Sequence, residues 1–348
     1  MRPSEHLATF EAQRPRLLRL GYRMLGSVSE AEDVVQEAWV RWAWVTDSVD
    51  TPAAYLTRIV TRLCLDQLKS ARTRREVYVG PWVPEPLMGS TEDEAVADNV
   101  TLTLMMAMER LSPLERAAFL LHNVFDIPLA EVAATLGRDP AAVRQLASRA
   151  RRHVQDERPR FIVPAEEAER IARAFYAAST SGDVTVLTGI LADEVAIYSD
   201  GGGKVIAFRN VVRGIERVIR LFQGVARKQA YQPRLLRPVT IDGLPGFVSI
   251  DRGHVLQTTA LDVRNEKIAA IYIVRNPDKL RHVAELLVAE IQPANAARPE
   301  LREVSMALGR WHDVVGCPDI GDGVALARSS QAGHASLRTF SDRACCTE

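Results

Sequence analysis

The sequence predicts a multidomain protein in which two all-α helical domains precede an α+β domain. Apolar residues recur at helical spacing through residues 1–76 and again through 99–158, whereas β-rich runs follow Pro164. A proline-rich segment separates the two helical stretches. At 348 residues the chain is also longer than a single core supports. We therefore expect helical domains over 1–76 and 99–158, a linker over 77–98, an α+β domain over 165–291 and a mostly poorly ordered tail over 292–348.

Composition narrows the class of protein. Lys and Arg total 44, Asp and Glu total 44, and 47% of residues are apolar, which excludes disordered, collagenous and disulfide-stapled chains. No apolar run approaches the ~18 residues of a membrane span. The first ten residues lack an apolar signal core. The cysteines at 64, 317, 345 and 346 lack metal-ligand spacing and fit a reducing cytoplasm. We expect a cytoplasmic protein with no metal, no cofactor and no membrane contact.

The first helical domain is expected to contain three helices. Gly26-Ser27 breaks the first apolar periodicity. Ser29 is placed to cap the second helix, with acidic residues in its first turn. Thr51-Pro52 begins the third, because proline suits the first helical position.

The balanced total charge conceals two basic segments. Between residues 58 and 75 there are six basic side chains and one acid, and between 144 and 152 four arginines and no acid. The compensating acids cluster at 30–37 and 92–98. Two basic segments on different elements suggest two phosphate-facing surfaces. Two ordinary solvated helix faces are the alternative explanation.

The second helical domain contains a helix–turn–helix pattern. Residues 129–136 form a short helix, Gly137 a left-handed turn, and Asp139 and Pro140 the start of the next helix. On that helix the side chains expected to face inward are Val143, Ala147, Ala150 and Val154. Those expected to face outward are Arg144, Gln145, Ser148, Arg149 and Arg152. An outward face of arginine and glutamine near a helix start suits base edges in a major groove.

The α+β domain begins with expected helices over 166–180 and 184–191. Strands are expected over 195–199, 235–241, 246–251, 255–263 and 267–274, with a hairpin turn at 264–266. A helix over 214–228 interrupts them, and one over 277–291 ends the domain. Helices before a curved antiparallel sheet make an α+β cone, which is often hollow.

Six segments, at residues 31–39, 58–75, 82–86, 143–152, 200–204 and 276–280, together resemble an extracytoplasmic-function sigma factor of RNA polymerase with a fused SnoaL-like domain. Residues 31–39 are similar to the region 2 helix that grips the polymerase β′ clamp helices, and 58–75 to the helix beside the −10 element. Residues 143–152 resemble the region 4 recognition helix for the −35 element. Three further segments match the group with the fused domain: WVPEP at 82–86, DGGGK at 200–204 and NPDKL at 276–280.

The resemblance implies core RNA polymerase, through its β′ clamp helices and β subunit, and promoter DNA as partners. The implied polymerase-binding residues are Asp33, Gln36, Glu37 and Arg41. The implied DNA-binding residues are Tyr55, Arg58, Arg62, Lys69, Arg72, Arg74 and Arg75 for the −10 element, and the outward-facing set of 144–152 for the −35 element. Asp33 and Glu37, one turn apart, can meet a basic coiled coil. Tyr55 can either stack on an unpaired base or pack in the core. Arg62 stands where the family usually has asparagine, so −10 specificity cannot be transferred.

The three fused-domain motifs suggest contacts between the linker and the C-terminal domain. Their residues are Trp82, Pro84, Glu85 and Pro86; Asp200, Gly201, Gly202, Gly203 and Lys204; and Asn276, Pro277, Asp278, Lys279 and Leu280. Each motif also has a local explanation: linker packing, a tight glycine turn, or a helix cap. We hypothesise that the fused domain sets the spacing of the two DNA-binding units. The resemblance implies that this domain regulates the protein in place of a separate anti-sigma protein.

A rival hypothesis is enzymatic, because SnoaL-like folds include cyclases and isomerases with a buried acid or base. Candidate groups are Tyr198, Asp251, His254 and Tyr272, with Phe175 and Tyr176 as a wall. Sequence spacing fixes no acid–base pair among them, so we expect no enzyme and leave a small ligand in this domain open. A simple repressor that uses only 109–157 would leave the first 75 residues unexplained.

Overall fold

The computed structural model describes residues 3–45, 49–76, 78–89, 100–155, 164–228, 233–251 and 255–294. Within these ranges the side chains of residues 3–4, 71–76, 165 and 288–294 are not described. The predicted acidic segment 92–98 and the predicted tail beyond residue 294 lie outside the described residues, as does His254.

The helical part of the chain contains the predicted helices. The first domain comprises α1 (Pro3–Leu25), α2 (Val28–Ala43) and α3 (Pro52–Glu76). The second comprises α5 (Leu102–Met108), α6 (Pro113–Phe119), the π-helical turn η1 (Leu120–Val124), α7 (Leu129–Leu136) and α8 (Pro140–Val154). The prediction of Ser29 as the cap of α2 was wrong. Ser27 occupies the N-cap and accepts a hydrogen bond from the Glu30 N–H, because the chain leaves the Gly26 turn already in position to start the helix.

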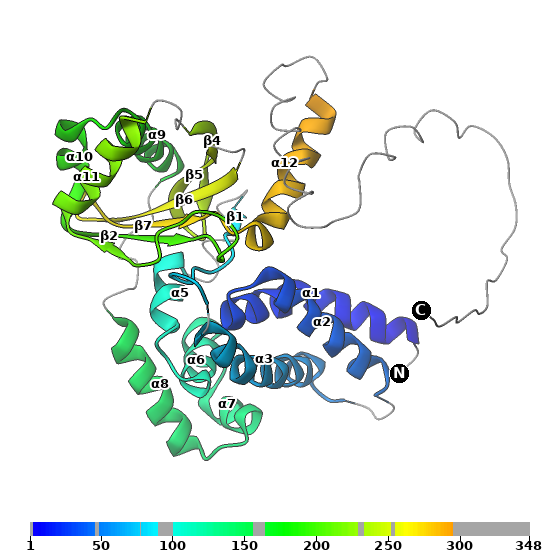
Figure 1. Ribbon diagram of the computed structural model, residues 1–348. Coiled ribbons are helices and arrows are strands. Elements are labelled where there is room, and N and C mark those ends of the chain that lie inside the picture. The colour runs from blue at the N-terminus through cyan, green and yellow to red at the C-terminus, as the bar shows by residue number, and fades with distance from the viewer. Residues whose placement is uncertain are drawn as a thin grey trace, which may run out of the picture.

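The two helical domains lie against each other (Figure 1) and share one apolar core. Buried side chains of α1–α3, such as Met24 and Leu56, belong to the same cluster as Phe119 and Val143 of the second domain. Helix α3 packs against α6 and α7, and the Arg16 guanidinium of α1 lies 5.7 Å from the ring centroid of Phe125. The two units are therefore joined in this structure by buried apolar surface as well as by the chain.

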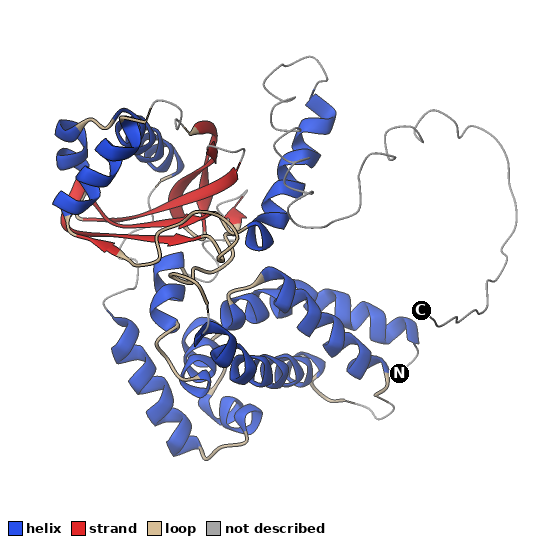
Figure 2. Cartoon of the chain, in the orientation of Figure 1, coloured by secondary structure: helices blue, strands red, loops and turns tan. Residues whose placement is uncertain are grey.

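The C-terminal domain is α+β, as predicted (Figure 2). Its helices are α9 (Ala165–Ser181), α10 (Val184–Ile190), α11 (Ile215–Ala226), the 3₁₀ turn η4 (Pro277–Leu280) and α12 (Arg281–Ala294). Its strands are β2 (Leu191–Asp200), β3 (Val212–Arg213), β4 (Arg234–Ile241), β5 (Leu244–Asp251), β6 (Val255–Arg264) and β7 (Lys267–Val274). With β1 (Met88–Gly89), the sheet order is β1-β4-β5-β6-β7-β2-β3, antiparallel except for the parallel pair β2–β7.

One strand of this sheet comes from the linker, which the sequence did not predict. Strand β1 (Met88–Gly89) pairs antiparallel with β4 at the sheet edge. A two-residue strand directly after a proline-rich segment has no alternation that could reveal it. The linker is consequently part of the C-terminal domain's hydrogen-bonded sheet.

The two faces of the sheet are covered differently (Figure 1). Helices α9–α11 pack on one face through a core that contains Phe175, Phe222 and Phe247. The opposite face is covered by α12, by Val83 of the linker and by Leu102 of α5. Because α5 also places Leu104 in the core of the helical domains, it lies between the helical part and the sheet.

Candidate nucleic-acid interface and interdomain junction

Helix α8 presents a basic face at the end of a helix–turn–helix unit. Gly137 ends α7 with φ 61°, and the Asp139 carboxylate caps α8 by accepting from the Ala141 N–H at 2.7 Å, as predicted. The predicted inner face, at 143, 147, 150 and 154, is buried. The predicted outer residues Arg144, Gln145, Ser148, Arg149 and Arg152 are all exposed. The fold thus leaves this face open to solvent.

Helix α2 presents an exposed face of mixed charge. Asp33, Gln36, Glu37 and Arg41 are exposed, and the Arg41 guanidinium donates to the Glu37 carboxylate at 3.0 Å. Two apolar side chains extend the same surface: Val40 is 45% exposed and Trp44, just after α2, is 83% exposed. Acidic groups beside exposed apolar side chains form a surface that suits a protein partner.

The predicted −10 face of α3 is partly covered. Arg62 and Lys69 are exposed, and Lys69 pairs with Asp66 at 2.8 Å. Arg58 and Tyr55 are half-buried, and the Tyr55 ring lies 5.9 Å from Trp42, centroid to centroid. Tyr55 therefore packs on the core here, while base stacking stays a prediction. The side chains of Arg72, Arg74 and Arg75 lie outside the described residues.

The three fused-domain motifs meet at the buried carboxylate of Asp200. Lys279 donates to its Oδ2 at 2.7 Å, and the N–H of Val83 in the linker donates to the same oxygen at 2.9 Å. Tyr78 donates to Oδ1 at 2.6 Å. Asn276 in turn donates to the Tyr78 hydroxyl at 2.9 Å. These groups hold the linker against the C-terminal domain, and we refer to them as the Asp200 cluster.

The glycines and outer residues of these motifs have distinct positions. Gly201 is buried, and a methyl group on Gly202 would lie within 2.8 Å of three Asn276 side-chain atoms. Lys204 and Asp278 form an exposed ion pair at 2.7 Å. Of the remaining motif residues, Pro84, Pro86, Pro277 and Leu280 are buried, whereas Gly203 is exposed.

The linker also contacts the turn between α1 and α2. The ring of Trp82 lies under the Lys279 ammonium, 4.2 Å from Nζ to the centroid, and a methyl on Gly26 would come within 2.5 Å of its Cη2. Glu85 accepts from the Val28 N–H at 2.8 Å and from the Ser27 hydroxyl at 2.7 Å. Its carboxylate therefore caps the N-terminus of α2, where a negative charge is favourable.

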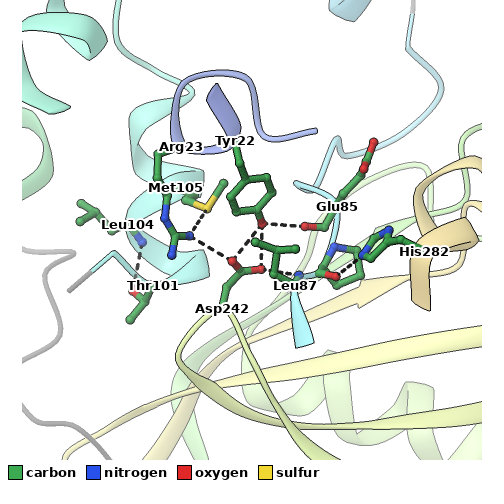
Figure 3. A network of polar contacts seen from close by, with 10 residues as sticks. Tyr22, Arg23, Glu85, Leu87, Thr101, Leu104, Met105, Asp242 and His282 are labelled. Atoms are coloured by element: carbon green, nitrogen blue, oxygen red, sulfur yellow. Dashed lines mark hydrogen bonds and ion pairs between the residues drawn. The ribbon is translucent and has the colours of Figure 1, made fainter. Parts of the chain in front are cut away.

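A second buried carboxylate, Asp242, joins the C-terminal domain to α1 (Figure 3). Asp242 lies in the β4–β5 turn with φ 43°. Tyr22 donates to both carboxylate oxygens at 2.9 and 3.0 Å, and Arg23 donates to Oδ1 at 3.0 Å. The Leu87 N–H of the linker donates to Oδ2 at 3.0 Å. The Asp242 side chain is fully buried, so these donors replace the water it has lost.

The backbone of Asp242 extends this junction. Its carbonyl accepts from the Leu102 N–H at the start of α5, and its N–H donates to the Leu87 carbonyl. Arg23 also donates to the Met105 sulfur of α5 at 3.1 Å. Four separate segments therefore meet at Asp242: α1, the linker, α5 and the β4–β5 turn of the sheet. We refer to these contacts as the Asp242 junction.

Burial sets the protonation of these groups. Desolvation, followed by the neighbouring Asp242 carboxylate, raises the pKa of Tyr22, and desolvation with Asp200 raises the pKa of Tyr78. Both hydroxyls therefore remain hydrogen-bond donors. Desolvation also raises the pKa of Asp242, against the opposing effects of Arg23 and the Leu87 N–H.

The buried Arg116 holds the two helical domains together. It donates to the Met24 carbonyl at the end of α1 at 2.7 Å and to the Met108 carbonyl at 3.2 Å. Its ion pair with Glu109 is 2.5 Å long. An arginine in this position donates to carbonyls at the ends of α1 and α5, where the helix leaves carbonyls without a full set of intrahelical donors.

The described enzymatic candidates lie on different faces of the sheet. Tyr198 and Tyr272 stack on each other on the face of the sheet covered by α5 and α12, at a centroid distance of 5.3 Å. Asp251 pairs with Arg275 at 2.7 Å. Phe175 lies in the core on the opposite face of the sheet. Tyr176 uses its hydroxyl to bond the backbone of Pro233 and Leu235. In the described ranges no group of three or more His, Cys, Asp or Glu side chains could hold a metal ion.

Sequence reasoning missed Tyr22, Arg23, Arg116 and Asp242. The Asp242-Gly243 dipeptide is a recognisable hairpin-turn signal and could have located the turn. Nothing in the sequence pairs it with α1. In the described part of the chain, no helix combines the length and apolar character needed to cross a membrane.

Comparison with known families identifies both helical units. Residues 9–74 match the family model of sigma-70 region 2, and residues 101–154 match that of sigma-70 region 4. A helix bundle of the region 2 family, followed by a helix–turn–helix unit of the region 4 family, thus has the composition of a bacterial transcription initiation factor.

Similar proteins extend the match into the C-terminal domain. The ECF RNA polymerase sigma factor SigJ of Mycobacterium tuberculosis is 38% identical over 296 residues, which cover 78% of this chain and 92% of SigJ. The probable ECF sigma factor SigI of the same species is 32% identical over 281 residues, covering 78% and 94%. The crystal structure of SigJ aligns with a TM-score of 0.64 at 33% identity, covering 79% of this chain and 98% of that one. The chain belongs to the extracytoplasmic-function sigma factors, which bind core RNA polymerase and direct promoter-specific initiation.

Proposed function

We propose that α8 reads the −35 element, that α3 contacts the −10 element and that α2 docks on the β′ clamp helices of cytoplasmic core polymerase. The observation that carries this proposal is the division of α8 into a buried apolar face and an exposed face with Arg144, Gln145 and Arg149. Side chains that reach bases must be exposed on a rigid element, and α8 meets both conditions.

In vitro transcription tests the assignment of α8. Core polymerase with the full-length chain is supplied with duplex templates randomised in the promoter region, and transcript 5′ ends are sequenced. We expect start sites that share an upstream consensus. Arg144→Ala with Arg149→Ala should relax the −35 part of that consensus, by about 1–3 kcal/mol of discrimination per base-reading arginine.

The matched control is Arg110→Ala, which removes an exposed arginine of the same domain outside α8. It should leave the consensus unchanged. An unaltered consensus in the double α8 variant would contradict the proposal.

The α2 surface is proposed as the polymerase-docking face because its acids, Asp33 and Glu37, are exposed beside Val40 and Trp44. The double substitution Asp33→Lys with Glu37→Lys reverses both charges. It should slow and weaken holoenzyme assembly, and the effect should be larger at low salt. Glu11→Lys, an exposed reversal on α1, is the control. Equal assembly by both variants would exclude this face.

We further propose that the C-terminal domain regulates initiation by setting the arrangement of the two DNA-binding units. The domain contacts the linker through the Asp200 cluster, α5 through its sheet face and α1 through Asp242. Removal of residues 165–348 should therefore change transcription or polymerase binding. Identical activity with and without these residues would reject the regulatory role.

A further inference from the structure

Helix α11 of the C-terminal domain carries a row of basic side chains that the functions above do not use. Arg217 and Arg220 of the helix and Arg227 at its C-cap are exposed, as are Arg213 at the end of β3 and Lys228 after the helix. The opposite side of α11 places Val218 and Phe222 in the domain core. The helix is therefore fixed on its inner side and basic on its outer side.

The row is continuous along the helix. With 3.6 residues per turn, positions 217, 220, 224 and 227 fall within an arc of about 80°. At 1.5 Å per residue, Arg217 and Arg227 are about 15 Å apart along the axis. This length corresponds to roughly four phosphates of one DNA strand, which carries a charge every ~3.4 Å along the duplex.

The arginines of this row form few ion pairs with acidic side chains. The one acid on the exposed face is Glu216, and its pair with Arg220 is long, at 3.9 Å, with both side chains at least 70% exposed. Arg217 and Arg227 have no side-chain partner among the described residues. On the neighbouring α9, Glu167 and Glu169 are paired with arginines of their own helix. The other exposed acids on the elements that contact α11 are Asp193 and Glu194 of β2, Glu166 of α9 and Asp183, which caps α10 beside the C-terminal end of α11.

Gly224 leaves the middle of the row open. A Cβ at this position would meet nothing within 4 Å, and the residue has an ordinary helical φ. A flat partner can therefore approach the helix closely between Arg220 and Arg227. The same open space allows a long charged side chain to be introduced there without a steric clash.

We propose that α11 is a third DNA-contacting surface, which holds the phosphate backbone of duplex DNA without reading its sequence. This inference rests on the proposed function, because it assigns the partner from the DNA that α3 and α8 already engage. The chemistry favours DNA over a protein partner, since the exposed arc carries no apolar side chain that could anchor a protein interface. In Figure 1, α8 and α11 both lie along the left edge of the molecule.

The sharpest test is a pair of opposite charges at Gly224. The full-length chain is titrated with a fluorescent duplex of mixed sequence, about 40 base pairs long, over about 50–200 mM salt. Gly224→Lys should tighten binding and Gly224→Glu should weaken it. Both substitutions replace glycine in a helix, so a purely structural effect would move the two affinities in the same direction.

A second variant measures the size of the surface. Arg217→Gln with Arg227→Gln should reduce the slope of log affinity against log salt by about 1.8, or about 0.9 per phosphate contact. Arg170→Gln with Arg173→Gln on α9 removes two arginines that are ion-paired within their own helix, and should leave the slope unchanged.

Three outcomes would overturn the proposal: absence of duplex binding by the wild-type chain, an unchanged slope in the α11 variant, or equal effects of lysine and glutamate at 224. Loss of polymerase affinity with unchanged DNA binding would assign α11 to a protein partner and overturn it as well. The promoter-consensus experiment on α8 is independent. If α8 reads the −35 element and the α11 variants are silent, the proposed function stands without this surface.

Discussion

Two buried aspartates of the C-terminal domain, Asp200 and Asp242, accept hydrogen bonds from the same three kinds of donor but connect different parts of the chain. Each accepts from a tyrosine hydroxyl, from a cationic side chain and from a backbone N–H of the linker. At Asp200 the tyrosine comes from the linker and the cation from the domain itself. At Asp242 both are neighbours on α1, Tyr22 and Arg23. The first site therefore fixes the linker to the domain, and the second fixes the domain to the helical part.

Because of this difference, Asp200 contributes to the stability of the C-terminal domain itself, whereas Asp242 contributes to the attachment of that domain to the helical part. A contact within the linker and the domain contributes to the fold whether or not the helical domains move. A contact to α1 can be lost by separation of the parts, with the domain still folded. The pair of sites thus allows the two roles to be tested with the same chemical change.

The largest expected effect comes from removing either carboxylate. Asp200→Ala leaves the Lys279 ammonium buried without its counter-charge and should lower the free energy of unfolding of the C-terminal domain by about 3–5 kcal/mol. Asp242→Ala likewise leaves the Arg23 guanidinium without its counter-charge. However, separation of α1 from the domain can return that guanidinium to water. We therefore expect the Asp242 variant to increase the radius of gyration and the Asp200 variant to lower the melting temperature.

Small-angle scattering and thermal denaturation of the two full-length variants distinguish these results. Gln257→Ala, a half-buried residue of β6 outside both sites, serves as the control. If both variants expanded the molecule equally, the division between fold and attachment would be wrong.

The second effect is the coupling across the Asp242 junction. Asparagine can replace Asp242 without its charge and tolerates its left-handed φ of 43°. Arg23→Met should destabilise the wild-type chain more than it destabilises the Asp242→Asn variant, with a coupling of about 1–3 kcal/mol. Denaturation of all four proteins in the cycle measures it. If the two changes in the free energy of unfolding were additive, the charge of Asp242 would contribute nothing to its interaction with Arg23.

These two sites also show what the sequence could and could not predict. Asp200 and Lys279 lie in five-residue motifs, so resemblance drew attention to both. Tyr22, Arg23 and Asp242 are single residues in distant segments, and no local pattern links them. The faces of α2 and α8 were predictable because helical periodicity depends on neighbouring residues. The core shared by the two helical domains could not be predicted in this way. Leu104 and Leu102 have the same apolar character, although Leu104 packs in that core and Leu102 packs against the sheet.

The third effect concerns the cap that joins the linker to α2. Glu85→Gln removes the charge that accepts from Val28 and Ser27, and should cost about 1–2 kcal/mol. If α2 docks on polymerase, fraying of its first turn should also weaken holoenzyme assembly. Glu115→Gln is a matched control, because that glutamate closes the capping box of a different helix, α6, with Ser112. Both variants should lose stability, and only Glu85→Gln should lose polymerase affinity, as measured by native gel titration.

The smallest effect is expected at the exposed ion pair of the same motifs. Lys204 and Asp278 are each 46% exposed, so water and salt screen their attraction, and Lys204→Ala should change stability by less than about 1 kcal/mol. Lys279→Ala should cost several times more, because it leaves the buried Asp200 carboxylate without its cation. Urea denaturation at low and high salt compares the two. A Lys204 variant with normal stability but altered transcription would show that the exposed half of these motifs contacts another molecule, whereas the buried half stabilises the fold.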